Sequence, residues 1–130
     1  MKAEGTFTVK MQAEPAYDDA DGMSLARVRF DKVFEGPLTA TGTNFALTAR
    51  SAAVPNSAAY VACERVRGTL DGKRGSFVIV HLGLMDRGAD SLQITIVPDS
   101  GSEELAGIGG SMKIQVVNGQ HFYVLEYAFR

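Results

Sequence analysis

The stretch that decides the fold reads Gly75-Ser-Phe-Val-Ile-Val-His-Leu-Gly-Leu-Met-Asp-Arg-Gly88. It is the longest apolar run in the sequence, and it carries one imidazole, His81. The preceding residues Asp71-Gly72-Lys73-Arg74 are typical of a turn, and Asp86-Arg87-Gly88 leads into the next segment. A short apolar run between turn residues is typical of a buried strand. We therefore interpret this stretch as the central strand of an antiparallel barrel.

The rest of the chain repeats this pattern of short strands separated by turns. Strands are predicted at Thr6–Ala13, Leu25–Glu35, Leu38–Arg50, Ala59–Leu70, Arg74–Met85, Ser91–Val97, Ser111–Val117 and Gln120–Phe129. Asn118-Gly119, between the last two, is the strongest short hairpin signal. Gly42 indicates a bend or bulge in the third strand. Within the glycine-rich loop Pro98–Gly110, residues 103–105 could form one turn of helix.

Short strands at even spacing indicate either a β-sandwich or a barrel. A closed barrel removes the exposed strand edges that an open sheet has to protect. The predicted fold is therefore all-β, a closed antiparallel barrel of about eight strands in one domain over residues 1–130. Closing it requires Thr6–Ala13 to pair with a late strand, most simply Phe122–Phe129.

Composition narrows the classes of partner and the compartment. A chain of 130 residues with 45% hydrophobic residues fits one folded domain. The formal charge of −2, without a basic cluster, argues against nucleic acid or an anionic membrane as the main partner. One cysteine excludes an internal disulfide, so a cytoplasmic location is expected. The N-terminus lacks the apolar block of a signal peptide, and no apolar run approaches the roughly 20 residues of a membrane helix.

Alternation along the central hairpin predicts which side chains face inward. Glu64 and His81 fall on the same face for a turn of either two or four residues, and a four-residue turn would place them directly opposite each other. The other face carries Arg65 and Arg67, which are expensive to bury. The face with Glu64 and His81 is therefore predicted to point into the barrel.

This choice leaves an apolar stripe on the outside of the barrel. Its members are Val78, Val80, Leu82 and Leu84. A stripe of this size is usually covered, which predicts a homo-oligomer, most simply a dimer, through these four residues. A loop of the same chain, Pro98–Gly110 or Glu14–Met23, is long enough to cover the stripe instead.

Glu64 and His81 form the strongest candidate site. A carboxylate beside an imidazole can orient the ring and raise its pKa, which would give a general acid or base. The alternative is a structural pair that closes the barrel core. The other candidate ligand-binding residues are Tyr60, Phe77, Met85, Tyr123 and Tyr127, and the tyrosines could equally be plain core. No catalytic residue is assigned.

The other groups of polar or glycine-rich residues do not predict a functional site. The acidic loop Glu14–Met23 lacks the glutamate that an EF-hand needs at its twelfth position. Cys63 falls on the face opposite His81, which disfavours a Cys-His nucleophile pair. With only two histidines and no ligand spacing, the sequence predicts no metal site and no cofactor. Residues 107–110 lack the Lys-Ser or Lys-Thr of a phosphate loop.

Four segments carry a family resemblance: Ala59–His81, Met85–Gly88, Val97–Gly107 and Gly119–Tyr127. They resemble the bacterial family called domain of unknown function 3224, over nearly the whole chain. The sequence departs from the family at Leu82, where a small polar residue is common. The resemblance implies a fold similar to plant allene oxide cyclase, an eight-stranded barrel with a central cavity, and no established activity. The motifs of the cyclase are not visible here, so none of its catalytic residues is carried over.

Three classes of function stay open. The first is a barrel that binds one small apolar or amphipathic ligand in its central cavity. The second is an enzyme of cyclase or isomerase type that acts through Glu64 and His81. The third is a structural or interaction protein whose barrel is filled by its own side chains. A filled interior would remove the first two, and an open pocket facing Glu64 and His81 would favour the second.

Overall fold

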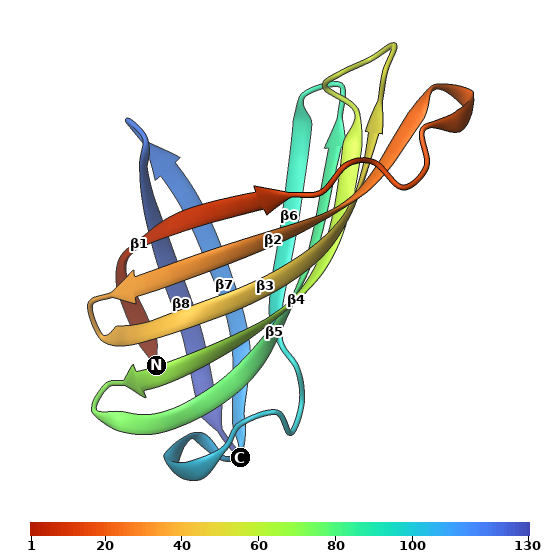
Figure 1. Cartoon of the computed structure of the whole chain (residues 1–130). Helices are drawn as coiled ribbons and strands as arrows, with labels where there is room; N and C mark the ends of the chain where they lie inside the picture. Colours follow the sequence, from red (N-terminus) through yellow and green to blue (C-terminus); the bar gives the residue numbers. More distant parts are fainter.

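The computed structural model describes residues 1–130, in which eight antiparallel strands close into one barrel (Figure 1). The strands are β1 (Lys2–Ala13), β2 (Met23–Glu35), β3 (Leu38–Ser51), β4 (Ala58–Leu70), β5 (Lys73–Asp86), β6 (Ala89–Ile96), β7 (Ile108–Val117) and β8 (Gln120–Phe129). Two single turns of 3-10 helix, η1 (Ala20–Gly22) and η2 (Glu103–Leu105), lie in the loops. No helix is long and apolar enough to cross a membrane. The predicted all-β barrel is confirmed, and its likeness to allene oxide cyclase stays a prediction.

The two ends of the chain meet, as the barrel requires. Residues 2–7 of β1 pair with residues 121–126 of β8, and the amino group of Met1 donates a hydrogen bond to the carbonyl of Tyr127 at 2.7 Å. The predicted closure is confirmed, but β1 begins earlier than Thr6. The strand continues through Gly5, where any side chain would overlap the ring of Tyr123. The glycine therefore permits a close approach of strand and ring.

The β4–β5 hairpin turns in two residues, the shorter of the two turn lengths that the sequence allows. Leu70 pairs with Lys73, and the two turn residues have positive φ angles, 49° at Asp71 and 82° at Gly72. That combination is the type I′ turn, whose twist matches the flanking strands. Glu64 and His81 are consequently not directly opposite each other. They still share the inner face, because side chains alternate along both strands.

The predicted orientation of this hairpin is confirmed. The inward side chains of β4 and β5 include Ala62, Glu64, Phe77, Ile79 and His81, and all of these are buried. The outward side chains include Val61, Cys63, Val80, Leu82 and Leu84, and all of these are exposed, whereas Val78 is half-buried.

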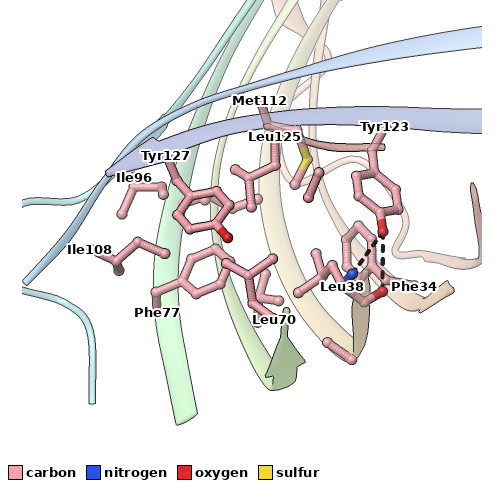
Figure 2. Packing of buried hydrophobic residues seen from close by; sticks show 14 of the residues in the cluster. Phe34, Leu38, Leu70, Phe77, Ile96, Ile108, Met112, Tyr123, Leu125 and Tyr127 are labelled. Carbon is pink, nitrogen blue, oxygen red and sulfur yellow. Dashed lines mark hydrogen bonds between the residues drawn. The ribbon is translucent and has the colours of Figure 1, made fainter. Parts of the chain in front are cut away.

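One end of the barrel is filled by a tightly packed core. Aromatic and aliphatic side chains from opposite walls interlock there, among them Phe34, Leu70, Phe77, Met112, Leu125 and Tyr127 (Figure 2). The loop between β6 and β7 closes this end, and η2 inserts the fully buried side chain of Leu105. The predicted helical turn within that loop is confirmed. No ligand could enter the barrel from this end without displacing side chains.

At the opposite end, which we call the open end, the strands separate. The pairing of β1 with β8 stops at Phe7 and His121. The pairing of β6 with β7 is limited to Ile94 with Met112 and Thr95 with Ser111. The tip of the β7–β8 hairpin therefore extends alone, and Figure 1 shows it well apart from the tips of the other hairpins.

Candidate functional site

Four polar side chains meet inside the barrel beside the core. They come from four consecutive strands: Lys32 from β2, Asn44 from β3, Glu64 from β4 and His81 from β5. Their exposed fractions are 7%, 2%, 0% and 1%. Charged residues are rarely buried to this degree unless they are paired. We call this cluster the Glu64 centre.

One oxygen of Glu64 holds the centre together. Its Oε1 accepts hydrogen bonds from Lys32 Nζ, Asn44 Nδ2 and His81 Nε2, each at 2.9 Å. Because an ionised carboxylate can only accept, the imidazole must carry a hydrogen on Nε2. The ammonium of Lys32 also lies 5.3 Å from the ring centre of Phe7, where the face of an aromatic ring attracts a cation.

Opposing effects set the charge state of Glu64. Burial raises its pKa, but the hydrogen bond from His81 and the positive charge of Lys32 lower it, with the hydrogen bond from Asn44 acting in the same direction. The pKa of Glu64 lies below its ordinary value as a result. The carboxylate is thus ionised at neutral pH and is a weak proton acceptor, which argues against its use as a general base.

Three buried atoms of the centre have no partner within the protein. These are Glu64 Oε2, Asn44 Oδ1 and His81 Nδ1. Glu64 Oε2 and Asn44 Oδ1 can only accept hydrogen bonds. An unsatisfied buried polar group costs about 1–3 kcal/mol. The centre is therefore suited to receive hydrogen bonds from donors such as water, a hydroxyl group or an amine.

Gly42 makes space for the carboxylate. A methyl group at this position would overlap Glu64 Oε2 and crowd the ring of Phe34. The strand pairing runs unbroken through Gly42, from Lys32 on one side to Val66 on the other. The bulge predicted from this glycine is therefore wrong, while the bend stays a prediction. The glycine is needed for the close approach of a side chain.

Tyr60 lies between the Glu64 centre and the open end. Its ring covers Gly83, where a side chain would overlap it, and the ring centre is 6.3 Å from that of His81. The side chain is half-buried, and its hydroxyl group makes no hydrogen bond within the protein. Burial raises the pKa of Tyr60, and the negative charge of Glu64 adds to the effect. The ring of Tyr60 thus forms a floor between the Glu64 centre and the open end.

Above this floor, apolar side chains on the inner face of the barrel are exposed. Met11 of β1 is 64% exposed, Val116 of β7 is 57% exposed and Leu92 of β6 is 42% exposed. The strand register places all three on the inner face, since Leu92 pairs with Gly83 and Val116 pairs with His121, while Met11 alternates with Phe7. We call Met11, Leu92 and Val116 the apolar mouth.

The predicted site residues fall into two groups. Glu64 and His81 are in direct contact, Tyr60 is next to them, and Met85 is half-buried near the rim of the open end, where it pairs with Ala58. Phe77, Tyr123 and Tyr127 instead belong to the packed core at the other end (Figure 2). Their surroundings are those of core side chains, which for the two tyrosines is the alternative that the sequence left open.

The hydroxyl groups of Tyr123 and Tyr127 form hydrogen bonds with the β2–β3 and β4–β5 turns, respectively. The Tyr123 hydroxyl accepts a hydrogen bond from the Leu38 amide at 3.1 Å, and it lies 3.0 Å from the carbonyl of Glu35. The Tyr127 hydroxyl donates to the carboxylate of Asp71 in the β4–β5 turn. Burial, with this bond to Asp71, raises the pKa of Tyr127 to about 12.

Sequence reasoning missed Lys32 and Asn44. Both occupy inward positions, Lys32 in the alternating series with Phe30 and Phe34, and Asn44 in the series with Ala46. A charged or amide residue in such an apolar series is the signal that could have identified them. No group of three or more His, Cys, Asp or Glu side chains is placed to hold a metal ion.

Comparison with known proteins adds a family and one close structural relative. A family model described as "Protein of unknown function (DUF3224)" matches residues 3–127. A crystal structure of a protein of unknown function from the DUF3224 family of Shewanella oneidensis MR-1 is 43% identical, with a TM-score of 0.93. That alignment covers 100% of this chain and 98% of the other. No curated protein matches the sequence.

Proposed function

The chain belongs to the DUF3224 family of proteins of unknown function, and within that family we propose that it binds one small apolar or amphipathic molecule at the open end of the barrel. The observation that carries the proposal is the exposure of Met11, Leu92 and Val116 on an inner face. Apolar side chains on a concave face, with a few polar groups nearby, are typical of small-molecule sites. A ligand that covers them removes apolar surface from water, which stabilises the complex by about 25 cal/mol per Å² of surface buried.

The floor of the site supplies polar contacts. The Tyr60 hydroxyl makes no hydrogen bond within the protein. A hydroxyl or carbonyl group of the ligand can pair with it. His121 adds a half-buried imidazole at the side, where its ring lies 5.0 Å from that of Phe7. An apolar wall with polar groups at its base suits an amphipathic ligand that enters with its polar end first.

An enzyme of cyclase or isomerase type is the second candidate. It is favoured by two buried polar atoms that have no partner, Glu64 Oε2 and His81 Nδ1. A substrate could reach them only if the ring of Tyr60 moved aside, since both residues are almost fully buried. The two candidates differ in their response to His81→Gln. That change would abolish turnover by the enzyme and would leave binding at the apolar mouth unchanged.

The third class, a purely structural barrel, describes the core end well. The interlocked side chains in Figure 2 leave that half of the interior to the protein itself. It does not account for apolar side chains exposed on the inner face at the other end. We also expect a reducing compartment, the cytoplasm, in which the exposed Cys63 stays a free thiol.

Native mass spectrometry of freshly purified protein tests the proposal. We expect a discrete added mass on the wild-type protein that disappears when the protein is denatured. Met11→Lys and Val116→Lys should lose this mass, because each puts a charge on the apolar mouth. Val33→Lys is the matched control, since Val33 is a similarly exposed apolar residue on the outer face of β2.

Two outcomes would count against ligand binding at the open end. One is a wild-type protein that carries no added mass and also fails to bind an apolar fluorescent probe. The other is an added mass that survives both mouth substitutions but is lost in Val33→Lys.

A further inference from the structure

The outside of the barrel carries a second apolar surface, separate from the mouth. Phe45 and Leu47 of β3, Val61 of β4, and Val80, Leu82 and Leu84 of β5 are each between 40% and 51% exposed. They lie on adjacent strands, and Leu47, Val61 and Leu82 form one continuous cross-strand row. We call these six residues the outer apolar face. A contiguous patch of this kind usually marks an interaction surface.

No other part of this chain covers the outer apolar face. The β6–β7 loop is held at the core end, where Ser102 binds Ser76 through backbone and hydroxyl groups and Leu105 enters the barrel. The β1–β2 loop lies along the start of β2, where Tyr17 and Asp18 form backbone hydrogen bonds with Leu25. Val80, Leu82 and Leu84 stay exposed, although Ser100 of the β6–β7 loop bonds to the backbone of Val78. The alternative that a loop covers the stripe is therefore wrong for these three residues, which are free to contact another molecule.

Unpaired charges lie at the two ends of the face and have opposite signs. Arg65 points outward four residues beyond Val61, toward the core end, and it makes no ion pair. Asp86 points outward on β5 four residues beyond Leu82, toward the open end, and it makes no ion pair either. Each charged residue lies four residues along its strand from the Val61–Leu82 pair, a distance of about 14 Å.

 Both separations correspond to four positions along the chain, because Cys63 and Leu84 are the only outward-facing residues in between. Arg65 and Asp86 therefore lie at equal distances from the Val61–Leu82 pair, on opposite sides of it.

We propose that a second copy of this chain covers the outer apolar face through a two-fold axis. The axis lies in the interface, passes through the Val61–Leu82 pair and runs roughly across the strands. This operation reverses the order of residues along the strands, so Arg65 of each copy faces Asp86 of the other. The apolar residues of the two copies then face one another, as in two sheets packed about 10 Å apart. The contact is isologous and closes at a dimer.

The charges define the orientation of this dimer, and the apolar residues supply most of its buried surface. A rotation about an axis parallel to the strands would instead place Arg65 beside its own copy and leave Asp86 without a partner. The proposal does not depend on ligand binding, because the apolar mouth and the outer apolar face lie on opposite sides of the barrel wall.

Sedimentation velocity over a dilution series tests the dimer. The wild-type protein should sediment at twice the 13.9-kDa mass of the chain. Arg65→Glu and Asp86→Arg should each raise the dissociation constant at least tenfold, because each places like charges together. The double variant Arg65→Glu/Asp86→Arg should restore the dimer, because it exchanges the two charges. Lys113→Glu is the control and should have no effect, since this exposed residue lies on β7, outside the outer apolar face.

Three results would overturn the proposal: a wild-type monomer at every concentration, a dimer that neither single charge reversal weakens, or a double variant that stays monomeric. Arg65 and Asp86 are exposed, so these variants should fold, which circular dichroism verifies. Val80→Lys/Leu82→Lys provides a second check, and it should give a folded monomer. A folded dimer of that variant would also overturn the proposal.

Discussion

Glu64 is the residue on which the polar part of the interior depends, because three donors share one of its oxygens. Its charge is matched by that of Lys32, so the pair is buried without net charge. Replacing a whole buried ion pair with apolar residues is often tolerated, whereas removing one partner leaves an uncompensated charge. The effects of single and paired substitutions should therefore differ sharply.

Glu64→Ala should lower the free energy of unfolding by about 3–5 kcal/mol, since it leaves the ammonium of Lys32 buried without its partner. Adding Lys32→Met to it should recover part of that loss. A double-mutant cycle of Glu64→Ala with His81→Ala should show coupling, because the two side chains share a hydrogen bond. Chemical denaturation gives each value, and strict additivity would mean that Glu64 and His81 do not interact.

The lowered pKa of Glu64 predicts a dependence of stability on pH. A carboxyl group with a lowered folded-state pKa contributes stability above its unfolded pKa of about 4.3 and loses it as the pH falls through the folded-state value. The free energy of unfolding should therefore decline below about pH 4.3. Glu64→Gln should flatten that decline, and Glu4→Gln is the control at an exposed carboxyl group. Equal slopes in the wild type and Glu64→Gln would contradict the assignment.

At the scale of the elements, alternation and turn residues were enough to predict all eight strands and the inward face of the central hairpin. They did not give the length of the β4–β5 turn. Lys73 and Arg74 look like turn residues, yet only Asp71 and Gly72 need positive φ angles, so the other two pair as strand.

Two further features depend on contacts that local sequence does not encode. Lys32 would normally be placed outside, and its burial depends on acceptors and rings from other strands. The short pairing between β6 and β7 could likewise not be predicted from the sequence. A strand pattern does not reveal how many residues of two neighbouring strands are paired. The sequence thus located Glu64 and His81, but not their other partners or the open end.

Leu105 of η2 should be the residue through which the β6–β7 loop stabilises the barrel. Leu105→Ala should lower the free energy of unfolding by about 2–5 kcal/mol, because it leaves a cavity in the core end. Met11→Ala is the control, and it should have a small effect because its side chain is mostly exposed. Denaturant melts of both variants measure the difference. Equal losses would mean that the core end and the open end are not distinct in packing.

At the scale of the whole molecule, two apolar surfaces lie on the two sides of one barrel wall. The outer apolar face has unpaired charges at its two ends and is the surface where we propose that a second copy of the chain binds. The apolar mouth lies on the inner face, above Tyr60 and the Glu64 centre, and is where we propose that a small molecule binds. The filled core end supports both surfaces and takes part in neither (Figure 2).

The most direct test of ligand binding at the open end is a methyl NMR titration with the amphipathic probe 8-anilinonaphthalene-1-sulfonate. Our account predicts saturable shifts of the methyl signals of Met11, Leu92 and Val116, while those of Leu47, Val61 and Leu82 stay in place. Shifts confined to the outer residues, or no shift at any residue of the apolar mouth, would contradict it.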